Sequence, residues 1–326
     1  MSERGKTIKF RDEYTMTLER PMVTRHYMMT WDLDRCVGCQ MGPTVCPKDA
    51  LTYVDGEIVD GRIVSKPSVD VDPDLCVLCG ICVEVCTVHA ISISVNDVPE
   101  NPVLKYDAFP EVRGHLTFDR ETFDISLKEL VINNCPTNII SYDEDKDTMA
   151  IKYEDCIRCR QCEVASNGAF KVTQRWQGSV ELRREKCVEG CLACADVCPT
   201  RALHINDQGQ LVLADYFCIK CGACMHACPI KPEFIEREFT FESQGLTITR
   251  TYQELVNPED LAIKVERWRT KPTDIKSAAW IEALRKLADD KASGVEIDQK
   301  RALRRKDLIL ALRGHTMPHF TRDQEE

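Results

Sequence analysis

The sequence lacks the marks of several protein classes. Its first residues, MSERGKTIKFRDEY, carry a charge every few positions and no apolar stretch of the kind found in a secretory signal. No uncharged apolar run approaches the ~18 residues that a membrane-spanning helix needs. Aromatic residues make up only 7% of the chain, and no basic stripe interleaved with aromatics is present. We therefore expect a soluble, cytoplasmic protein with no membrane span and no nucleic-acid partner.

Motifs for nucleotide binding and for common hydrolytic chemistry are also missing. The sequence contains no G-x-G-x-x-G, no H-E-x-x-H and no G-x-S-x-G. His89, His204 and His226 stand near cysteine clusters, and we interpret them as packing or surface residues. No catalytic residue is predicted.

The charge is unevenly distributed along the 326 residues, whose net charge is −10. Residues 258–326 carry 15 Lys and Arg against 13 Asp and Glu, whereas the first 257 residues carry 28 against 40. The acidic part of the chain is therefore the part that holds the cysteines. We interpret its acidic residues as part of a solvated surface.

Cysteine is abundant, with 19 residues, and the count is odd. A secreted disulfide scaffold is normally shorter, evenly paired and preceded by a signal peptide. In a reducing compartment, a cysteine-rich pattern more often indicates metal binding.

The segments around the cysteine clusters repeat. Those that lead into a cluster are short and β-prone, with an acidic or polar turn before the cysteine: WDLDRC, VDVDPDLC, IKYEDC, ELRREKC and VLADYFC. Those that leave a cluster also match one another: CPKDALTY, CTVHAISI, CPTNIISY, CPTRALHI and CPIKPEFI. Each exit segment predicts a turn of helix followed by a short strand. The repeats therefore predict an α+β fold built from one small unit.

Two cysteine runs have the same specific spacing, C-x2-C-x2-C-x3-C. They are Cys76, Cys79, Cys82 and Cys86, and Cys218, Cys221, Cys224 and Cys228. This is the bacterial ferredoxin run, which holds cubane [4Fe-4S] clusters. Structural zinc is the alternative, but zinc sites use two C-x2-C pairs that are well separated in sequence. The spacing therefore favours iron–sulfur clusters.

In a two-cluster ferredoxin unit, the first three cysteines of one run share a cluster with the fourth cysteine of the other run. This rule predicts four complete ligand sets: Cys46/Cys76/Cys79/Cys82, Cys135/Cys156/Cys159/Cys162, Cys187/Cys191/Cys194/Cys228 and Cys198/Cys218/Cys221/Cys224.

A fifth set has only the three cysteines Cys36, Cys39 and Cys86, because Gly42 stands where the third ligand of its run belongs. We expect either a [3Fe-4S] cluster or a [4Fe-4S] cluster whose fourth iron takes water, a remote side chain or a partner's ligand. An empty, degenerate site is the alternative. The five sets together use all nineteen cysteines and leave none for a disulfide or a nucleophile.

In the middle module, the second set has lost its ligands. Its positions are occupied by Ile125, Lys128, Val131 and Ser166. We expect this module to keep the fold, with apolar residues filling the place of the second cluster.

These observations predict three tandem ferredoxin-like modules of the two-cluster type with a mostly helical C-terminal extension. The expected divisions are an N-terminal arm (1–29), module 1 with two clusters (30–100), module 2 with one (101–175), module 3 with two (176–236) and the extension (237–326). In the extension, 238–252 alternates like a hairpin or edge strand, and 273–290 and 298–313 read as amphipathic helices. The extension is either a solvated charged face or an arm that docks on a larger partner.

The chain resembles the polyferredoxin subunit of archaeal tungsten or molybdenum formylmethanofuran dehydrogenase. The resemblance rests on RHYMMTWDLDRCVGC, VDVDPDLCVLCGICVEVC, NPVLKYDAFPEV, REKCVEGCLACADVCPTRAL, YFCIKCGACMHACP and SAAWIEALRKL. It implies a non-catalytic subunit that feeds electrons through a chain of clusters to catalytic subunits, which reduce carbon dioxide. A ferredoxin or a heterodisulfide-reductase-type protein is the implied electron donor.

Two other functions stay open at this point. The chain could serve as the electron-transfer subunit of another anaerobic complex, such as an energy-converting hydrogenase. It could also be an enzyme that uses the open iron near Gly42 as a Lewis acid.

Overall fold

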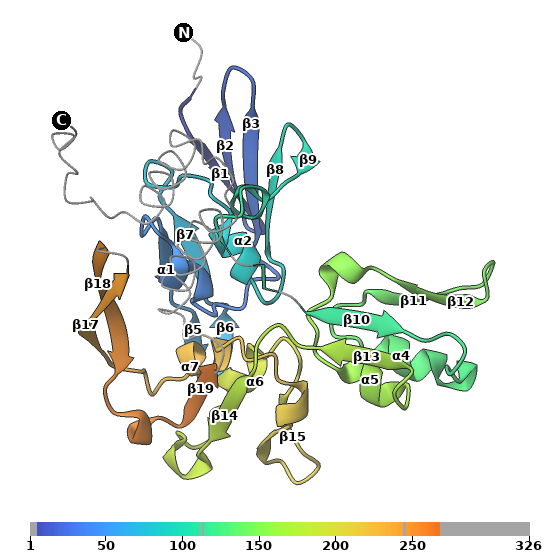
Figure 1. Ribbon diagram of the computed structural model, residues 1–326. Coiled ribbons are helices and arrows are strands. Elements are labelled where there is room, and N and C mark those ends of the chain that lie inside the picture. Colours follow the sequence, from blue (N-terminus) through green and yellow to red (C-terminus); the bar gives the residue numbers. More distant parts are fainter. Residues whose placement is uncertain (1–4, 110, 113, 244–245, 268–326) are drawn as a thin grey trace, which may run out of the picture.

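The order strand, helix, hairpin, helix, strand occurs three times along the chain, and each time the first and last strands pair (Figure 1). The structure is a computed structural model, and it describes residues 5–109, 111–112, 114–243 and 246–267. The α-helices in this part of the chain have only four to seven residues. Among these described helices, none is long and apolar enough to cross a bilayer. The helices expected at 273–290 and 298–313 lie outside the described residues.

The first unit spans residues 26–95. Strand β3 (His26–Asp32) pairs antiparallel with β8 (Ile91–Val95), and this pairing closes the unit. Between them lie α1 (Met41–Val45), β4 (Leu51–Val54), β7 (Ser68–Val71) and α2 (Ile81–Val85), with β4 paired antiparallel to β7. The alternate residues Met29 and Trp31 of β3 are buried, as expected of a strand with one face on a core.

The sheet of the first unit is extended on both edges. Strands β1 (Ile8–Arg11) and β2 (Thr15–Pro21) continue it on one side, and β9 (Val98–Pro99) continues it on the other, in the order β1-β2-β3-β8-β9. The side chains of Lys9 and Arg11 pair with Asp70 of β7 at 2.6 and 2.8 Å, and they tie the added strands to the unit.

A second hairpin, β5 (Glu57–Val59) and β6 (Arg62–Ser65), is inserted between β4 and β7. It reaches a later part of the chain, because the Arg62 guanidinium binds the Asp196 carboxylate with a closest contact of 2.8 Å. Short helix α3 (Pro102–Lys105) follows β9 and begins the connection to the second unit.

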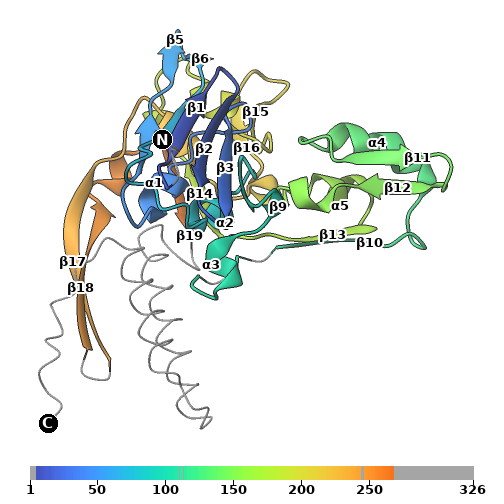
Figure 2. The same cartoon turned by 90° about the horizontal axis from the view of Figure 1, so that it is seen from above.

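The second unit spans residues 115–173 and projects from the rest of the described chain in both views (Figures 1 and 2). Strands β10 (His115–Phe118) and β13 (Phe170–Thr173) pair antiparallel and enclose the other elements. These are α4 (Lys128–Asn134), β11 (Ile140–Asp143), β12 (Thr148–Ile151) and α5 (Gln161–Ala165).

The third unit differs from the others in where its last strand comes from. Strand β14 (Gly178–Leu182) is followed by α6 (Ala193–Asp196), β15 (Leu203–Ile205), β16 (Leu211–Leu213) and α7 (Ala223–Ala227). The strand that pairs with β14 is β19 (Ile263–Arg267), which lies beyond residue 236, in the part of the chain expected to form the extension. The hairpin expected at 238–252 is present as β17 (Phe234–Ser243) and β18 (Leu246–Leu255), and it is inserted before β19.

The three units share one hydrophobic core, which we call the junction core. It combines residues from all three of them, including three predicted cluster ligands. Its buried members are Cys86, Val88, Ala90, Ile157, Cys159, Val197, Ile219, Cys221, Ala223 and Ala227. Cys36 and Cys39 pack against it from the first unit. The described chain is therefore joined around the place where these cysteines meet.

Candidate iron–sulfur sites

Four cavities in the protein are each lined by four cysteines. Each contains about 310 to 350 Å³ of space not filled by protein atoms, part of it open to solvent, and its remaining walls are mainly apolar. The thiols that the cavities bring together are those that the crossed pairing of runs predicted: Cys135/Cys156/Cys159/Cys162, Cys187/Cys191/Cys194/Cys228, Cys198/Cys218/Cys221/Cys224 and Cys46/Cys76/Cys79/Cys82.

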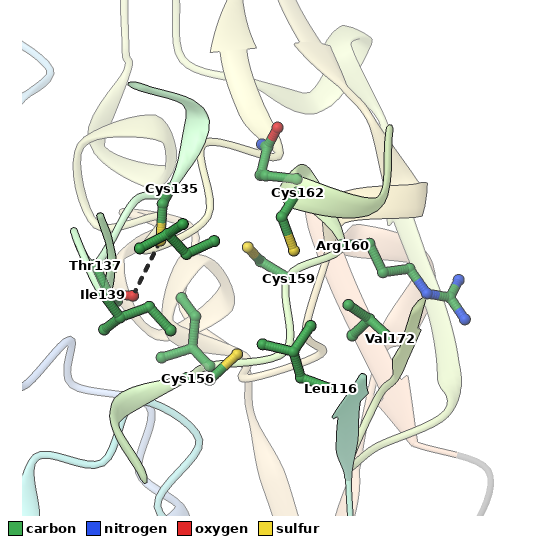
Figure 3. A pocket seen from close by; sticks show the side chains of 12 residues that line it. Leu116, Cys135, Thr137, Ile139, Cys156, Cys159, Arg160, Cys162 and Val172 are labelled. Atoms are coloured by element: carbon green, nitrogen blue, oxygen red, sulfur yellow. Dashed lines mark hydrogen bonds between the residues drawn. The ribbon is translucent and has the colours of Figure 1, made fainter. Parts of the chain in front are cut away.

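Figure 3 shows the cavity of the second unit from close by. The sulfurs of Cys156, Cys159 and Cys162 point toward one central space, and Cys135 approaches it from the other side. The Thr137 hydroxyl lies 3.7 Å from the Cys135 sulfur. Leucine, isoleucine and valine side chains close the remaining walls, while the guanidinium of Arg160 points away.

The three cysteines of the incomplete set also lie near one another, because Cys36 and Cys39 both pack against the junction core that contains Cys86. The charge of Cys86 contributes to the raised pKa of the Cys36 thiol, which reaches about 11 and results mainly from burial. Gly42 is the second residue of α1, and Cys82, Cys162 and Cys224 are the second residues of α2, α5 and α7. The missing ligand position is therefore present in the backbone but has no side chain.

Left-handed backbone conformations shape the loops between the first two cysteines of a run. The residue before the second cysteine has a φ of 64° at Gly38, 54° at Leu78, 60° at Arg158 and 57° at Lys220. Non-glycine residues adopt this conformation rarely and at a cost of about 1–3 kcal/mol. The conformation directs backbone N–H groups inward, as in the anion-binding nests of iron–sulfur sites. The Lys220 amide, for example, donates to the Cys218 sulfur at 3.4 Å.

The segment after the fourth cysteine is a turn and not the helical turn that we expected. Asp49, His89, Asn138 and Arg201, each three residues after such a cysteine, have φ values of 51° to 54°, with which a right-handed helix cannot continue. The turn places the Ala50 and Ala90 amides against sulfur. They donate to Cys46 Sγ and Cys86 Sγ, at 3.2 Å in both cases. The strand expected after each turn is present in the first two units and at β15.

The electrostatics of the cavities favour a cationic occupant. Burial, followed by the charges of Cys228, Cys187 and Cys191, raises the pKa of Cys194 to about 12. Burial likewise raises the pKa of Cys79 and Cys159 to about 12. Such thiols bind metal as thiolates, and the positive charge of bound iron supplies the stabilisation that they lack in an apolar pocket.

One buried donor lacks a partner beside a cavity: the indole N–H of Trp31, which lines the Cys46/Cys76/Cys79/Cys82 cavity. A cluster sulfur there would accept that hydrogen bond, so the residues present fit a [4Fe-4S] group.

The second unit shows what replaces the lost set. Val131 is completely buried in the same core as Phe170, whose ring packs against Phe118 with centroids 4.6 Å apart. Ser166 occupies the fourth-cysteine position, and its hydroxyl accepts a hydrogen bond from the Phe170 amide at 2.9 Å. The same hydrogen bond occurs at Cys46 and Cys86, where the backbone amide four residues later in the chain donates to the cysteine sulfur. Of the four positions, Val131 and Ser166 are buried, whereas Ile125 is 47% exposed, so only part of the lost set is filled by packed side chains.

Comparisons with known proteins agree with the cavities. Residues 179–236 match the family model of a 4Fe-4S dicluster domain, and residues 69–92 match that of a 4Fe-4S binding domain. The chain is 29% identical over 99 residues to a polysulfide reductase subunit from Wolinella succinogenes, covering 25% of this chain and 51% of that protein. It is 32% identical over 91 residues to the polyferredoxin MvhB from Methanothermobacter marburgensis, covering 25% of this chain and 21% of that protein. The chain therefore spans about half or less of these relatives.

A solved structure shares the fold. It is a chain of the formate dehydrogenase–heterodisulfide reductase–formylmethanofuran dehydrogenase complex from Methanospirillum hungatei, with a TM-score of 0.60 and 22% identity. The match covers 86% of this chain and 92% of that one. Together with the family matches, it shows that this protein contains ferredoxin-type 4Fe-4S domains.

Sequence reasoning missed several residues around the cavities. The left-handed Leu78, Arg158 and Lys220 carry no glycine signal, and Trp31 reads as an ordinary strand residue. The left-handed residues share a fixed offset from the second cysteine of each run, which could have identified them, whereas no repeated signal marks Trp31.

Proposed function

We propose that the protein is an electron-transfer subunit of polyferredoxin type, built from three ferredoxin modules that together hold five iron–sulfur clusters. The single observation that carries this proposal is the lining of four separate cavities by the four complete cysteine sets. The fifth cluster would bind to Cys36, Cys39 and Cys86. When bound, such clusters accept and release single electrons, with potentials between roughly −700 and +450 mV.

The proximity of the sets to one another supports a connected path. The charge of Cys39 contributes to the raised pKa of Cys221, which belongs to a set in the third unit. Cys86 lies in the junction core with Cys159 of the second unit. The two sets of the third unit adjoin in the same way, because the charge of Cys194 acts on Cys224. Cys36 also packs against the core that holds Cys46 and Cys82, so every set lies beside another set.

The protein's own residues have three tasks in this function. The thiolates would hold each cluster, and the backbone N–H groups of the left-handed loops would stabilise negative charge on it. Buried apolar side chains such as Leu116 and Val172 exclude water from the cavities. No side chain needs to form or break a covalent bond.

Links between units hold the sets in fixed relative positions. Arg175, at the end of the second unit, donates from Nη1 to the Cys86 carbonyl at 2.8 Å and from Nε to the Val112 carbonyl at 3.2 Å. Gln161 of α5 donates to the Thr200 carbonyl of the third unit at 3.0 Å. Because tunnelling falls steeply with distance, such cross-links serve electron transfer directly.

We further propose that the chain serves a formylmethanofuran dehydrogenase-type complex. The motif resemblance of the sequence and the shared fold with a chain of the Methanospirillum hungatei complex support this partner. A different anaerobic complex is the second candidate, since the polysulfide reductase subunit and the MvhB polyferredoxin are also similar to the chain.

The test begins with anaerobically purified full-length protein. Iron and acid-labile sulfide analysis should give about 19 to 20 iron atoms per chain, the content of five clusters. An iron content of about 8 to 12 atoms per chain would refute the assignment of the clusters in the first or second unit.

Cys162→Ser should remove about four irons and one EPR signal. The matched control Ser166→Ala, in the lost set of the same unit, should leave both unchanged. Subunits that co-purify from the native host identify the complex.

A further inference from the structure

Two buried hydroxyl groups without a hydrogen-bond partner lie at the three-cysteine site. The first belongs to Tyr53 of β4, whose oxygen is inaccessible to solvent and unpartnered. Burial, then Asp55, then the charges of Cys36 and Cys39 raise the pKa of Tyr53 to about 12. The phenol is therefore a neutral donor close to two of the three thiols.

The position of Tyr53 relates it to the missing ligand. Leu51 and Tyr53 are two residues apart on one strand, so their side chains lie on the same face. A Cβ atom added to Gly42 would lie 3.3 Å from Leu51 Cδ1. The face of β4 that carries Tyr53 is thus the face that adjoins the place of the absent side chain. The tyrosine ring also lies beside the imidazole of His226, with ring centroids 6.1 Å apart.

The second hydroxyl belongs to Thr87, which directly follows Cys86. This residue is 2% exposed, and its hydroxyl oxygen has no partner. The corresponding position after the fourth cysteine of the other runs is proline, and Pro47, Pro199 and Pro229 line the cavities of their own cysteines. By analogy with these prolines, Thr87 would border the cluster bound by Cys86. Its hydroxyl is a hydrogen-bond donor at a position where the other sites have a proline ring.

A buried donor without a partner is unfavourable unless something absent from the protein chain accepts its hydrogen bond. An occupied three-cysteine site would offer thiolate and cluster sulfurs as acceptors. The three-cysteine site already has one anionic ligand fewer than its neighbours. Hydrogen bonds to its sulfurs would lower the negative charge further and so favour the reduced state.

We propose that the Tyr53 and Thr87 hydroxyls donate hydrogen bonds to sulfurs of the three-cysteine cluster and thereby raise its reduction potential. This inference rests on the proposed function, because it requires a cluster at Cys36, Cys39 and Cys86. Tyr53 and Thr87 are positioning residues in this role and do not ligate iron.

The test compares Tyr53→Phe and Thr87→Val with the wild-type protein in EPR-monitored redox titrations of the full chain. Tyr53→Phe removes only the hydroxyl, and Thr87→Val replaces the hydroxyl with a methyl group of similar size. Each should shift the reduction equilibrium of the three-cysteine cluster about tenfold toward the oxidised state, which is ~59 mV for a one-electron couple. The double variant should shift it further, and iron content should stay at the wild-type value. The matched control Tyr14→Phe, on an exposed residue, should change nothing.

The outcomes separate this inference from the function beneath it. If the wild-type protein has no iron at the three-cysteine site, the proposed fifth cluster fails and this inference fails with it. If that cluster is present but both variants keep its potential within error, only the hydrogen bonds are refuted. If Tyr53→Phe instead loses iron at an unchanged fold by circular dichroism, the hydroxyl is a ligand and the proposed donor role is wrong.

Discussion

Restoring the missing thiol at Gly42 tests the incomplete site most directly. Gly42 is the second residue of α1, the position at which α2 carries Cys82, and its φ is not in the left-handed region. A Cβ there would lie 3.3 Å from Leu51 Cδ1 and 3.8 Å from Cys82 Cβ. The closer atom is the end of a flexible side chain, so a shift of a few tenths of an ångström admits the substitution. The gain in helix propensity offsets part of this strain, and we expect the free energy of unfolding to change by less than about 1 kcal/mol.

The assay is iron and sulfide content with Mössbauer and EPR spectra of anaerobically purified Gly42→Cys. If the wild-type site holds a three-iron cluster, the variant should gain about one iron per chain and lose the three-iron signal. If it holds four irons with a non-cysteine ligand, the iron count stays constant and the unusual iron becomes equivalent to its neighbours. Gly42→Ala supplies the same Cβ without sulfur and should match the wild-type spectra. A Gly42→Cys protein with wild-type spectra and an alkylatable new thiol would refute the placement of the missing ligand.

Three further substitutions probe the packing that holds the sites. Phe170→Ala removes a completely buried ring of the second unit and should lower the free energy of unfolding by about 3–5 kcal/mol in denaturant titrations; a loss below about 1 kcal/mol would contradict the packing of this ring in the core. Arg175→Met should lower the free energy of unfolding by roughly 3 kcal/mol in the same titrations, because it leaves the Glu84 carboxylate and buried carbonyls without their cation. Arg62→Ala breaks an exposed ion pair with Asp196, so the free energy of unfolding measured by calorimetry should fall by no more than about 1 kcal/mol.

The cysteine spacing predicts much of the site because each set is local. Three ligands come from one short run, and the fourth comes from the other run of the same unit. The cavities combine the thiols in that way, as with Cys135 and Cys156. Their roles as cluster ligands remain a prediction that iron analysis must test.

The closing strand of the third unit could not be predicted from the same pattern. Strand β19 follows the last cysteine, Cys228, only after a long hairpin, and nothing near it resembles the exit segments of the other runs. Such an insertion adds little to the entropy of closing a loop, so a fold tolerates it without a local sequence signal. The junction core also could not be predicted from the sequence, because Cys86, Cys159 and Cys221 are far apart along the chain.

The position of the incomplete site gives its loss of a ligand a consequence for the whole chain. Under the proposed function, this site adjoins the complete set of its own unit, since Cys36 packs against the core that holds Cys46 and Cys82. It also adjoins the second unit through the junction core and the third unit through Cys39 and Cys221. A linear wire gives each inner cluster two neighbours, whereas these contacts give the three-cysteine site three. A cluster with one thiolate fewer carries less negative charge and is easier to reduce. Electrons should therefore collect at the branch point, and its potential should determine how they divide among the three units.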